Sequence, residues 1–333
     1  MDAERYSMRS FRGSDYGPAA ALHNAIYPDH PISGESFRRL ERAIALPVGP
    51  LPRYVVEDRR DRAFVGLGAL DRNPFEDDAA RPWFYAEVHP EHRGVGIGSH
   101  LYATLLADAH RRGATGLRCT VREGRTVEMS FLARRGFVER RRSWMSVLDV
   151  GSADTARLPS LVRALAKEGI EFTDLRTEGP GDPRVLRQVH ALESETGGDV
   201  PRLGAFTPLS FAEFRRLEVD GNEFLPEAWI LAKDGPRYVG LTSAAREPAE
   251  PKVLRQSYTA TLPAYRRRRI AQTLKLLLIE YAKGAGFASI TTSNDSLNAP
   301  MWNLNARLGF RRTGTRIHTE CAFGADGTAG RSA

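Results

Sequence analysis

Hydrophobic and polar positions follow two different spacings along this chain. Residues 83–88 form an aromatic, β-rich run that Pro90 ends, and apolar residues then recur at helical spacing at Ile97, Leu101 and Leu105. This pattern predicts a strand, a turn and a helix that ends near Gly113. The remaining pattern of the first half predicts strands at 5–14, 53–57, 63–70, 117–121 and from 136 toward 150, with helices at 18–26, 34–46 and 126–134.

The same order of elements starts again near residue 170. Adding 173 takes Pro90 to Pro263 and Ile97 to Ile270, and no gap is needed over the region compared. We therefore predict two copies of one domain, fused head to tail. The predicted parts are a first domain at 1–150, a helical linker at 151–169, a second domain at 170–323 and a disordered tail at 324–333.

The turn between the strand and the helix contains Gly94, Gly96 and Gly98. Glycine lets backbone N–H groups approach a ligand, and the first amides of a helix are unpaired. Each negative charge at such an end gains about 0.3–1 kcal/mol, so a diphosphate would suit it, and Arg93 adds a positive charge. A dinucleotide-binding fingerprint fits less well, because the third glycine is misplaced and the strand at 117–121 carries no acid.

Composition narrows the class of protein further. The chain has 333 residues, of which 41% are hydrophobic and 27% charged, as expected for about two globular domains. It opens without a signal peptide, its longest apolar run at 276–279 is too short to span a membrane, and its two cysteines provide no disulfide framework. We therefore expect a cytoplasmic protein. The eight histidines lack metal-binding spacing, so we predict no metal.

These motifs resemble those of the GNAT superfamily of acyl-CoA N-acyltransferases, in particular its tandem-domain members with a mycothiol-synthase-like architecture. The family motif is Q/R-x-x-G-x-G/A at the start of the central helix. The matching residues are Arg93, Gly96 and Gly98 in the first copy and Arg266, Arg269 and Ala271 in the second. The resemblance implies an α/β (α+β) fold of two tandem GNAT domains, each a mixed, mostly antiparallel, splayed sheet flanked by helices.

The resemblance also implies acetyl-CoA as the cofactor. Its pantetheine arm would lie between the fourth and fifth strands, and a backbone N–H near Val88 would polarise the thioester carbonyl. The expected cofactor contacts are Val88, Arg93, Gly94, Val95, Gly96, Ile97 and Gly98. The second copy has an altered motif, and a second cofactor site there would involve Leu262, Arg266, Arg268, Arg269 and Ala271. For its arginine run we favour a degenerate or non-catalytic site over cofactor binding, and a contact with nucleic acid is the third alternative.

Acyl transfer requires a neutral amine, and Glu87 is our candidate to take its proton, directly or through water. The structural alternative is a solvated carboxylate or the partner of an arginine. The matching residue in the second copy is Ala260, which offers no acid. Many family members carry a tyrosine general acid where this chain has Leu132 and Asn305, so we do not expect one here. Asn294, Asn298 and Asn305 are candidates to orient a substrate, or else caps and turn residues.

We predict an N-acetyltransferase that moves an acetyl group from acetyl-CoA to a primary amine of a small molecule or peptide, with the first domain as the catalyst. One alternative is a non-catalytic acyl-CoA-binding or sensing protein. Another is an RNA-associated protein, which the net charge of +7 would suit. We expect a monomer or homodimer without a membrane partner, and a nucleic-acid partner is the weakest of these alternatives.

Overall fold

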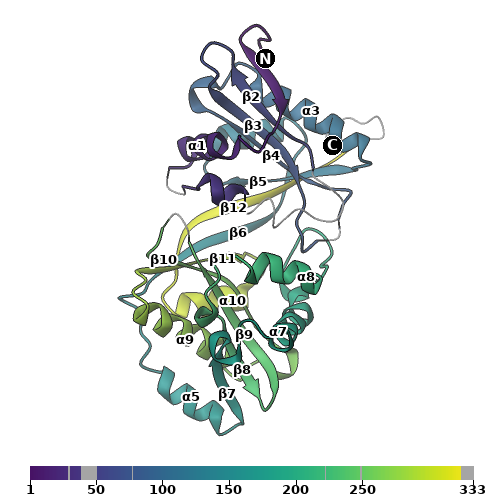
Figure 1. Ribbon diagram of the computed structural model, residues 1–333. Helices are drawn as coiled ribbons and strands as arrows, with labels where there is room; N and C mark the ends of the chain where they lie inside the picture. The colour runs from purple at the N-terminus through teal and green to yellow at the C-terminus, as the bar shows by residue number, and fades with distance from the viewer. Residues whose placement is uncertain (29–30, 39–50, 77, 222, 248–249, 324–333) are drawn as a thin grey trace. The chain divides into compact units, whose positions relative to one another are not determined.

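The chain forms two compact units, Met1–Arg140 with Ile317–Ala333 (unit 1) and Arg141–Arg316 (unit 2). Figure 1 shows the computed structural model, which describes residues 1–28, 31–38, 51–76, 78–221, 223–247 and 250–323. Each unit contains a mixed, mostly antiparallel sheet with helices packed on it, so the predicted fold class is confirmed. The predicted tail at 324–333 and most of the predicted helix at 34–46 lie outside the described residues.

The sheet of unit 1 has the strand order β1-β2-β3-β4-β5-β12. All neighbours in the run from β1 to β4 are antiparallel, and β5 is parallel to β4. The elements are β1 (Tyr6–Ser10), α1 (Tyr16–Ile26), β2 (Arg53–Asp58), β3 (Phe64–Asp71), β4 (Trp83–Val88), η1 (Pro90–His92), α3 (Ile97–Arg111), β5 (Gly116–Arg122), α4 (Thr126–Ala133) and the start of β6 (Val138–Asp149).

Alternate residues of β4 point to opposite faces of this sheet. Phe84 and Val88 pack with residues of α3, whereas Tyr85 and Glu87 face α1. Helix α3 approaches the sheet closely at Gly68, where an added Cβ would stand 3.0 Å from side-chain atoms of Leu101 and Leu105. The two faces of β4 therefore pack against different helices, α3 and α1 (Figure 1).

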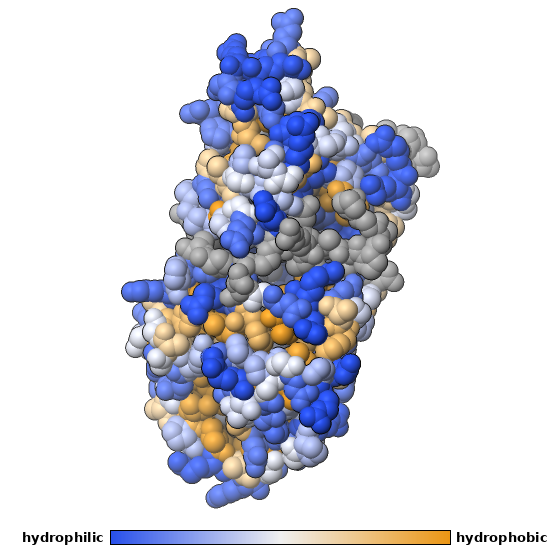
Figure 2. Space-filling view, in the orientation of Figure 1, coloured by the Kyte–Doolittle hydropathy of each residue, from blue (hydrophilic) through white to orange (hydrophobic). Residues whose placement is uncertain are grey.

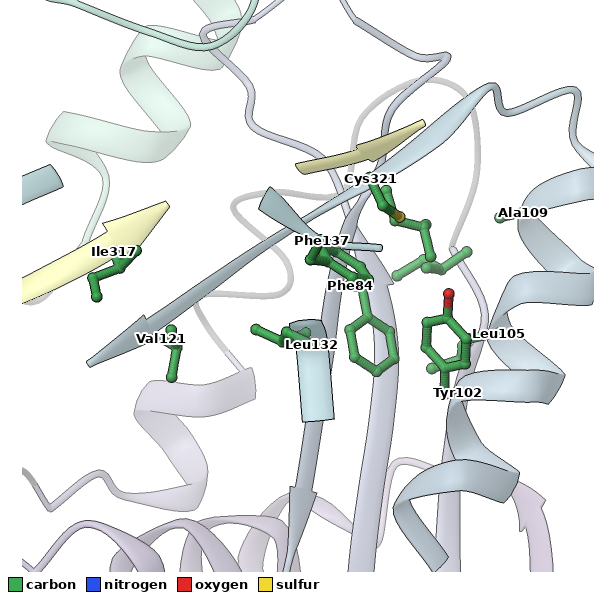
Figure 3. Packing of buried hydrophobic residues seen from close by; sticks show 11 residues of the cluster. Phe84, Tyr102, Leu105, Ala109, Val121, Leu132, Phe137, Ile317 and Cys321 are labelled. Atoms are coloured by element: carbon green, nitrogen blue, oxygen red, sulfur yellow. The ribbon is translucent and has the colours of Figure 1, made fainter. Parts of the chain in front are cut away.

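The core of unit 1 lies between α3, β4 and β5, as Figure 3 shows. The rings of Phe84 and Tyr102 meet edge to face with their centroids 5.4 Å apart. Leu132, at a position where the resemblance would place a tyrosine, is a buried member of this core. Its hydrocarbon side chain has no acidic proton to give to a leaving group.

Unit 2 has the strand order β6-β11-β10-β9-β8-β7. Helix α5 lies within the predicted linker at 151–169, and it packs on α9 and β7 as part of this unit. The elements are α5 (Leu158–Ala166), β7 (Ile170–Asp174), α6 (Leu175–Glu178), α7 (Pro183–Thr196), η2 (Gly197–Asp199), α8 (Phe211–Phe214), the π-helical turn η3 (Arg215–Val219), η4 (Pro226–Ala228), β8 (Ile230–Asp234), β9 (Arg237–Arg246), β10 (Val253–Thr261), η5 (Pro263–Tyr265), α9 (Ile270–Gly284), β11 (Ser289–Asp295), α10 (Ala299–Arg307) and the start of β12 (Arg311–Ala322).

The internal repeat that the sequence predicts is present in the structure. The offset of 173 positions carries α3 (Ile97–Arg111) onto α9 (Ile270–Gly284) and β5 onto β11 with identical bounds. It also carries β6 (Val138–Asp149) onto β12 (Arg311–Ala322). A shared offset over helices and strands alike indicates two copies of one structural unit.

The last strands of the two copies are exchanged between the units. Strand β6 follows α4 of unit 1 but pairs with β11 of unit 2, from Asp149↔Ser289 to Ser143↔Asp295. The end of β12 lies beside β5 of unit 1, where the Thr319 hydroxyl donates to the Cys119 carbonyl at 3.0 Å. The units therefore differ from the predicted domains at 1–150 and 170–323, because each unit is completed by a strand from the other part of the sequence.

A buried arginine holds the end of β12 in unit 1. The guanidinium of Arg118 on β5 is fully buried, and it bonds Glu76 at 2.9 Å and Glu320 of β12 at 3.1 Å, with Asp78 as a third partner. Three carboxylates around one guanidinium keep this charge compensated out of water. Within the described residues, no helix is long and apolar enough to cross a membrane, and hydrophilic residues cover most of the face in Figure 2.

A buried lysine makes the stability of unit 2 depend on pH. Lys275 on α9 is 3% exposed, its Nζ donates to Gln256 Oε1 at 2.6 Å, and burial lowers its pKa from 10.5 to about 7. Between these two values the unfolded chain binds a proton that the folded chain does not. Lys275 therefore makes the unfolding free energy rise with pH, by about 1.4 kcal/mol per pH unit.

We expect the variant Lys275→Met to lose this slope. The unfolding free energy of Lys275→Met minus that of the wild type should be largest near pH 7 and should fall as the pH approaches 10, because the wild type gains stability over this range. Urea titrations followed by tryptophan fluorescence at several pH values measure the difference. The exposed Lys252→Met variant is the control and should leave the slope unchanged. A difference between Lys275→Met and wild type that is constant with pH would contradict a neutral buried amine.

Candidate active site

Strand β4 is fully paired on one side and nearly unpaired on the other. It pairs with β3 at six positions, from Trp83↔Asp71 to Val88↔Gly66, but with β5 only at Trp83↔Arg118. The His89 amide donates to the Val65 carbonyl of β3 at 2.9 Å. Because successive amides of a strand point to opposite edges, the Val88 N–H points to the side from which β5 has departed.

A glycine turn follows at the end of this open edge. Gly94 and Gly96 have φ values of +81° and +88°, which glycine adopts without strain. Gly96 caps α3 without any side-chain hydrogen bond, so the first amides of the helix lack a capping partner from that residue. Val95 is 44% exposed beside them, whereas Ile97 is buried and can offer a ligand only its backbone.

The open space around the turn differs between its glycines. A Cβ added at Gly96 would stand 2.8 Å from the backbone nitrogen of Met1, so the start of the chain lies against this turn. A Cβ added at Gly98 would meet only Phe131 at 3.5 Å and Val88 at 3.8 Å, which are ordinary contacts. Only the Gly96 position therefore requires glycine for both its space and its backbone angle.

Arg93 joins the turn to the strand. Its Nε donates to the Val88 carbonyl at 3.1 Å, and one of its terminal nitrogens lies 4.0 Å from a carboxylate oxygen of Glu128. The side chain remains 34% exposed. Its positive charge is thereby held beside both the open strand edge and the helix amides.

Glu87 lies on the opposite face of β4, toward α1, and is only 3% exposed. Its Oε1 accepts a hydrogen bond from His23 Nδ1 at 2.8 Å. Its Oε2 is buried without a hydrogen-bond partner among the described residues. The solvated carboxylate considered for this position is therefore wrong, and a buried acceptor without a partner calls for an explanation.

Two further residues complete the surroundings of Glu87. The Tyr85 hydroxyl lies 3.5 Å from His23 Nδ1, and burial together with the charge of Glu87 raises the pKa of Tyr85 well above its ordinary value. The ring of Tyr27 lies 4.9 Å from that of His23, centroid to centroid. Burial and the Glu87 charge also raise the pKa of Tyr27. Both phenols therefore stay protonated at neutral pH.

The sequence analysis did not include His23 among the candidate site residues. Its spacing from Ala19 and Ile26 places it on the buried stripe of α1, where an imidazole is unusual. This spacing is the signal that could have singled it out. Its contact with Glu87 joins positions 64 apart, which no local pattern reveals.

Unit 2 repeats the backbone of this site with different side chains. Strand β10 pairs with β11 only from Val253↔Ser289 to Arg255↔Thr291, and from there to Thr261 it is paired with β9 alone. Arg267 and Arg269 take the left-handed φ values of +63° and +67° where unit 1 has Gly94 and Gly96. A left-handed backbone conformation costs a residue with a Cβ atom about 1–2 kcal/mol.

The arginines of the altered motif have partners of their own. Arg266 donates to the Thr261 carbonyl at 3.2 Å, repeating the contact of Arg93, and also pairs with Asp199. Arg268 pairs with Glu168 at 2.8 Å. Arg269 is exposed at the start of α9, and Ala271 follows it in the first turn.

Leu262 is not placed as a contact of the second cofactor site would be. Its side chain is 3% exposed and its amide donates to the Val239 carbonyl, so neither is directed to a ligand. The equivalent of Val88 is Thr261, whose hydroxyl is buried without a partner among the described residues. A cofactor contact in unit 2 equivalent to that of Val88 would be made by Thr261 rather than by Leu262.

The three asparagines are engaged within unit 2. Asn298 caps α10, with its Oδ1 accepting from the Met301 amide at 3.2 Å. Asn305 is fully buried, and its Nδ2 donates to Asn294 Oδ1 at 2.6 Å while its own Oδ1 has no partner among the described residues. The part of the chain that the structure describes holds no group of three or more residues fit to bind a metal.

The open strand edge, the adjoining glycine turn at a helix N-terminus and the buried carboxylate of unit 1 fit the class of acyl-CoA-dependent N-acyltransferases, and unit 2 repeats the backbone of this site without the glycines or the carboxylate. A family model described as the acetyltransferase (GNAT) family matches residues 20–137 and 192–310, and the chain belongs to this family. It is thus a GNAT-type N-acetyltransferase by descent, with acyl-CoA and an acceptor as its class of ligands.

Solved structures share this fold over nearly the whole chain. A GCN5-related N-acetyltransferase from Sphaerobacter thermophilus is 17% identical with a TM-score of 0.70, covering 96% of both chains. A tandem GNAT protein from the clavulanic acid biosynthesis pathway is 20% identical with a TM-score of 0.73, covering 95% of this chain and 98% of its own. At these identities the likeness shows the fold alone. A search among curated proteins finds no match.

We expect the turn to tolerate alanine at Gly98 but not at Gly96. Gly96→Ala places a Cβ against Met1 at a left-handed φ, which costs about 1–2 kcal/mol and lowers the melting temperature by several degrees. Gly98→Ala lies in the helix without a clash and should be neutral or stabilising by up to about 1 kcal/mol. Differential scanning calorimetry compares them; equal melting temperatures would contradict this account of the turn.

Proposed function

We propose that unit 1 transfers an acetyl group from acetyl-CoA to a primary amine of a small molecule or peptide. The observation that carries this proposal is the parting of β4 from β5 immediately before the glycine turn. An extended pantetheine arm can add to the open edge as a strand would. A diphosphate can then reach the amides that follow Gly96, with Arg93 beside it.

Val88 and Glu87 would act from the two sides of β4. The Val88 N–H faces the open edge, where it can donate to the thioester oxygen as that oxygen gains negative charge. The amine nitrogen attacks the carbonyl carbon, the carbon–sulfur bond breaks, and CoA leaves as a thiolate. Before the attack, Glu87 supplies the negative charge that draws a proton from the acceptor ammonium, directly or through a neighbouring group, and the nitrogen loses its second proton to water as the amide forms.

The second unit would not catalyse the same reaction. Ala260 stands where unit 1 has Glu87, and the side chain of Arg269 stands at the glycine position that meets the diphosphate. Unit 2 would therefore serve as a degenerate site. No observation on its described residues favours nucleic acid over this role.

Arg93→Ala should weaken binding of acetyl-CoA to unit 1. Loss of one charge-assisted contact to phosphate costs about 1.5–3 kcal/mol, which is about tenfold or more in Kd. Isothermal titration calorimetry measures the change. Arg112→Ala, at the exposed far end of α3, is the matched control and should bind as the wild type does. Unchanged affinity in Arg93→Ala would count against this cofactor site.

Glu87→Gln should lower turnover by about 10²–10⁴-fold while leaving acetyl-CoA affinity within twofold of the wild type, since the residue faces away from the cofactor edge. Release of free thiol from acetyl-CoA with putrescine, ethanolamine, glucosamine or glycine measures turnover. The exposed Glu4→Gln is the control. Tight binding of acetyl-CoA without thiol release from any of these amines would favour the sensing alternative.

A further inference from the structure

The contact between His23 and Glu87 is an acid–base pair of unequal exposure. The side chain of Glu87 is 1% exposed and that of His23 is 26% exposed, with 2.8 Å between Oε1 and Nδ1. An incoming amine therefore meets the imidazole before it can meet the carboxylate. This order decides which group receives a proton first.

The hydrogen bond also assigns the tautomer of His23. An ionised carboxylate only accepts hydrogen bonds, so Nδ1 must carry the proton that lies between the two groups. The neutral ring then has its lone pair on Nε2, at the edge turned away from Glu87. Among the described residues, Nε2 has no hydrogen-bond partner.

Resting on the proposed function of unit 1, we propose that His23 is a catalytic residue whose Nε2 takes the proton of the acceptor ammonium, with Glu87 as the positioning residue behind it. The proton moves from the ammonium to Nε2 and leaves a lone pair on the amine. That lone pair forms the new bond to the carbonyl carbon as the carbon–sulfur bond breaks. The nitrogen of the new amide loses its second proton to water, and the imidazolium, held by the charge of Glu87, returns its proton to the thiolate or to water.

Glu87 is the charged group in direct contact with His23, and positively charged groups lie farther away, beyond the ring of Tyr27. From β4, Glu87 is negative and Tyr85 is a neutral phenol. From α1, the ring of Tyr27 lies beside the imidazole. The guanidinium groups of Arg122 and Arg125 lie 4.9 and 5.1 Å from the centroid of the Tyr27 ring. The charge of Glu128 contributes to the raised pKa of Tyr27.

Unit 2 provides an internal comparison for this pair. The offset of 173 carries His23 to Thr196 and Tyr85 to Tyr258, and the two hydroxyl groups of unit 2 lie 2.9 Å apart. The helix and strand are thus held together there without an imidazole or a carboxylate, since Glu87 corresponds to Ala260. Packing alone does not require the pair in unit 1.

Chemical rescue of His23→Ala tests the role of the imidazole. With the amine that the wild type uses fastest among putrescine, ethanolamine, glucosamine and glycine, we expect kcat to fall by about 10²–10⁴-fold. Added imidazole should restore at least tenfold of this loss, whereas pyrazole, a ring of the same size but far weaker basicity, should not. Acetyl-CoA affinity, measured by titration calorimetry, should stay within twofold.

His190→Ala is the matched control, because His190 is also half-buried but bonds the Leu209 carbonyl in unit 2. It should keep the wild-type kcat. A His23→Ala variant with wild-type kcat, or a loss that imidazole does not relieve, would overturn the role of His23 and leave Glu87 as the direct base. A wild-type protein that does not bind acetyl-CoA would instead overturn the proposed function.

Modification by diethyl pyrocarbonate tests the pair without any acceptor. The reagent attacks an accessible, unprotonated imidazole nitrogen, and mass spectrometry locates the product. We expect His23 to react faster than His190, whose Nε2 is engaged with Leu209. A rate for His23 no higher than that for His190 would overturn the assignment of Nε2 as the free base.

Discussion

The parting of β4 from β5 is the constraint on which the site of unit 1 depends. A strand that is paired on one side only offers its remaining amides to a ligand, and its side chains still alternate between two faces. In β4 these faces separate the tasks, because Val88 packs toward α3 and the glycine turn while Glu87 reaches His23 on α1. A single short strand can thereby serve a cofactor at its edge and an acceptor on its face.

Those parts of the molecule that depend on local chemistry could be predicted from the sequence. The left-handed φ angles at Gly94 and Gly96 favour glycine, and the spacing of Ile97 and Leu101 fixes the buried stripe of α3. The repeat could be found because equal spacing of such local signals survives where the side chains have diverged. Arg267 and Arg269 even keep the left-handed backbone without glycine.

Features that depend on distant contacts could not be predicted in the same way. The burial of Glu87 and its bond to His23 arise only when α1 packs on the sheet, so the strand pattern alone left a solvated carboxylate open. The exchange of β6 and β12 escaped detection because the two strands are equivalent in the repeat, and each fits either position. Leu262 was named in the second site although the offset of 173 carries Val88 to Thr261, and the structure shows the Leu262 amide already paired with the Val239 carbonyl.

The exchanged strands also affect how the molecule is made. Strand β5 has its neighbour on β12 about two hundred positions away, since Cys119 and Thr319 are 200 residues apart. During synthesis, the first unit to leave the ribosome therefore keeps one side of β5 uncovered until the second unit has nearly been translated. Exposed strand edges invite pairing with other chains. A gene cut between the two copies would yield fragments with β1–β6 and β7–β12, and each could complete its sheet only if β6 paired with β5, or β12 with β11, in place of the exchanged partner.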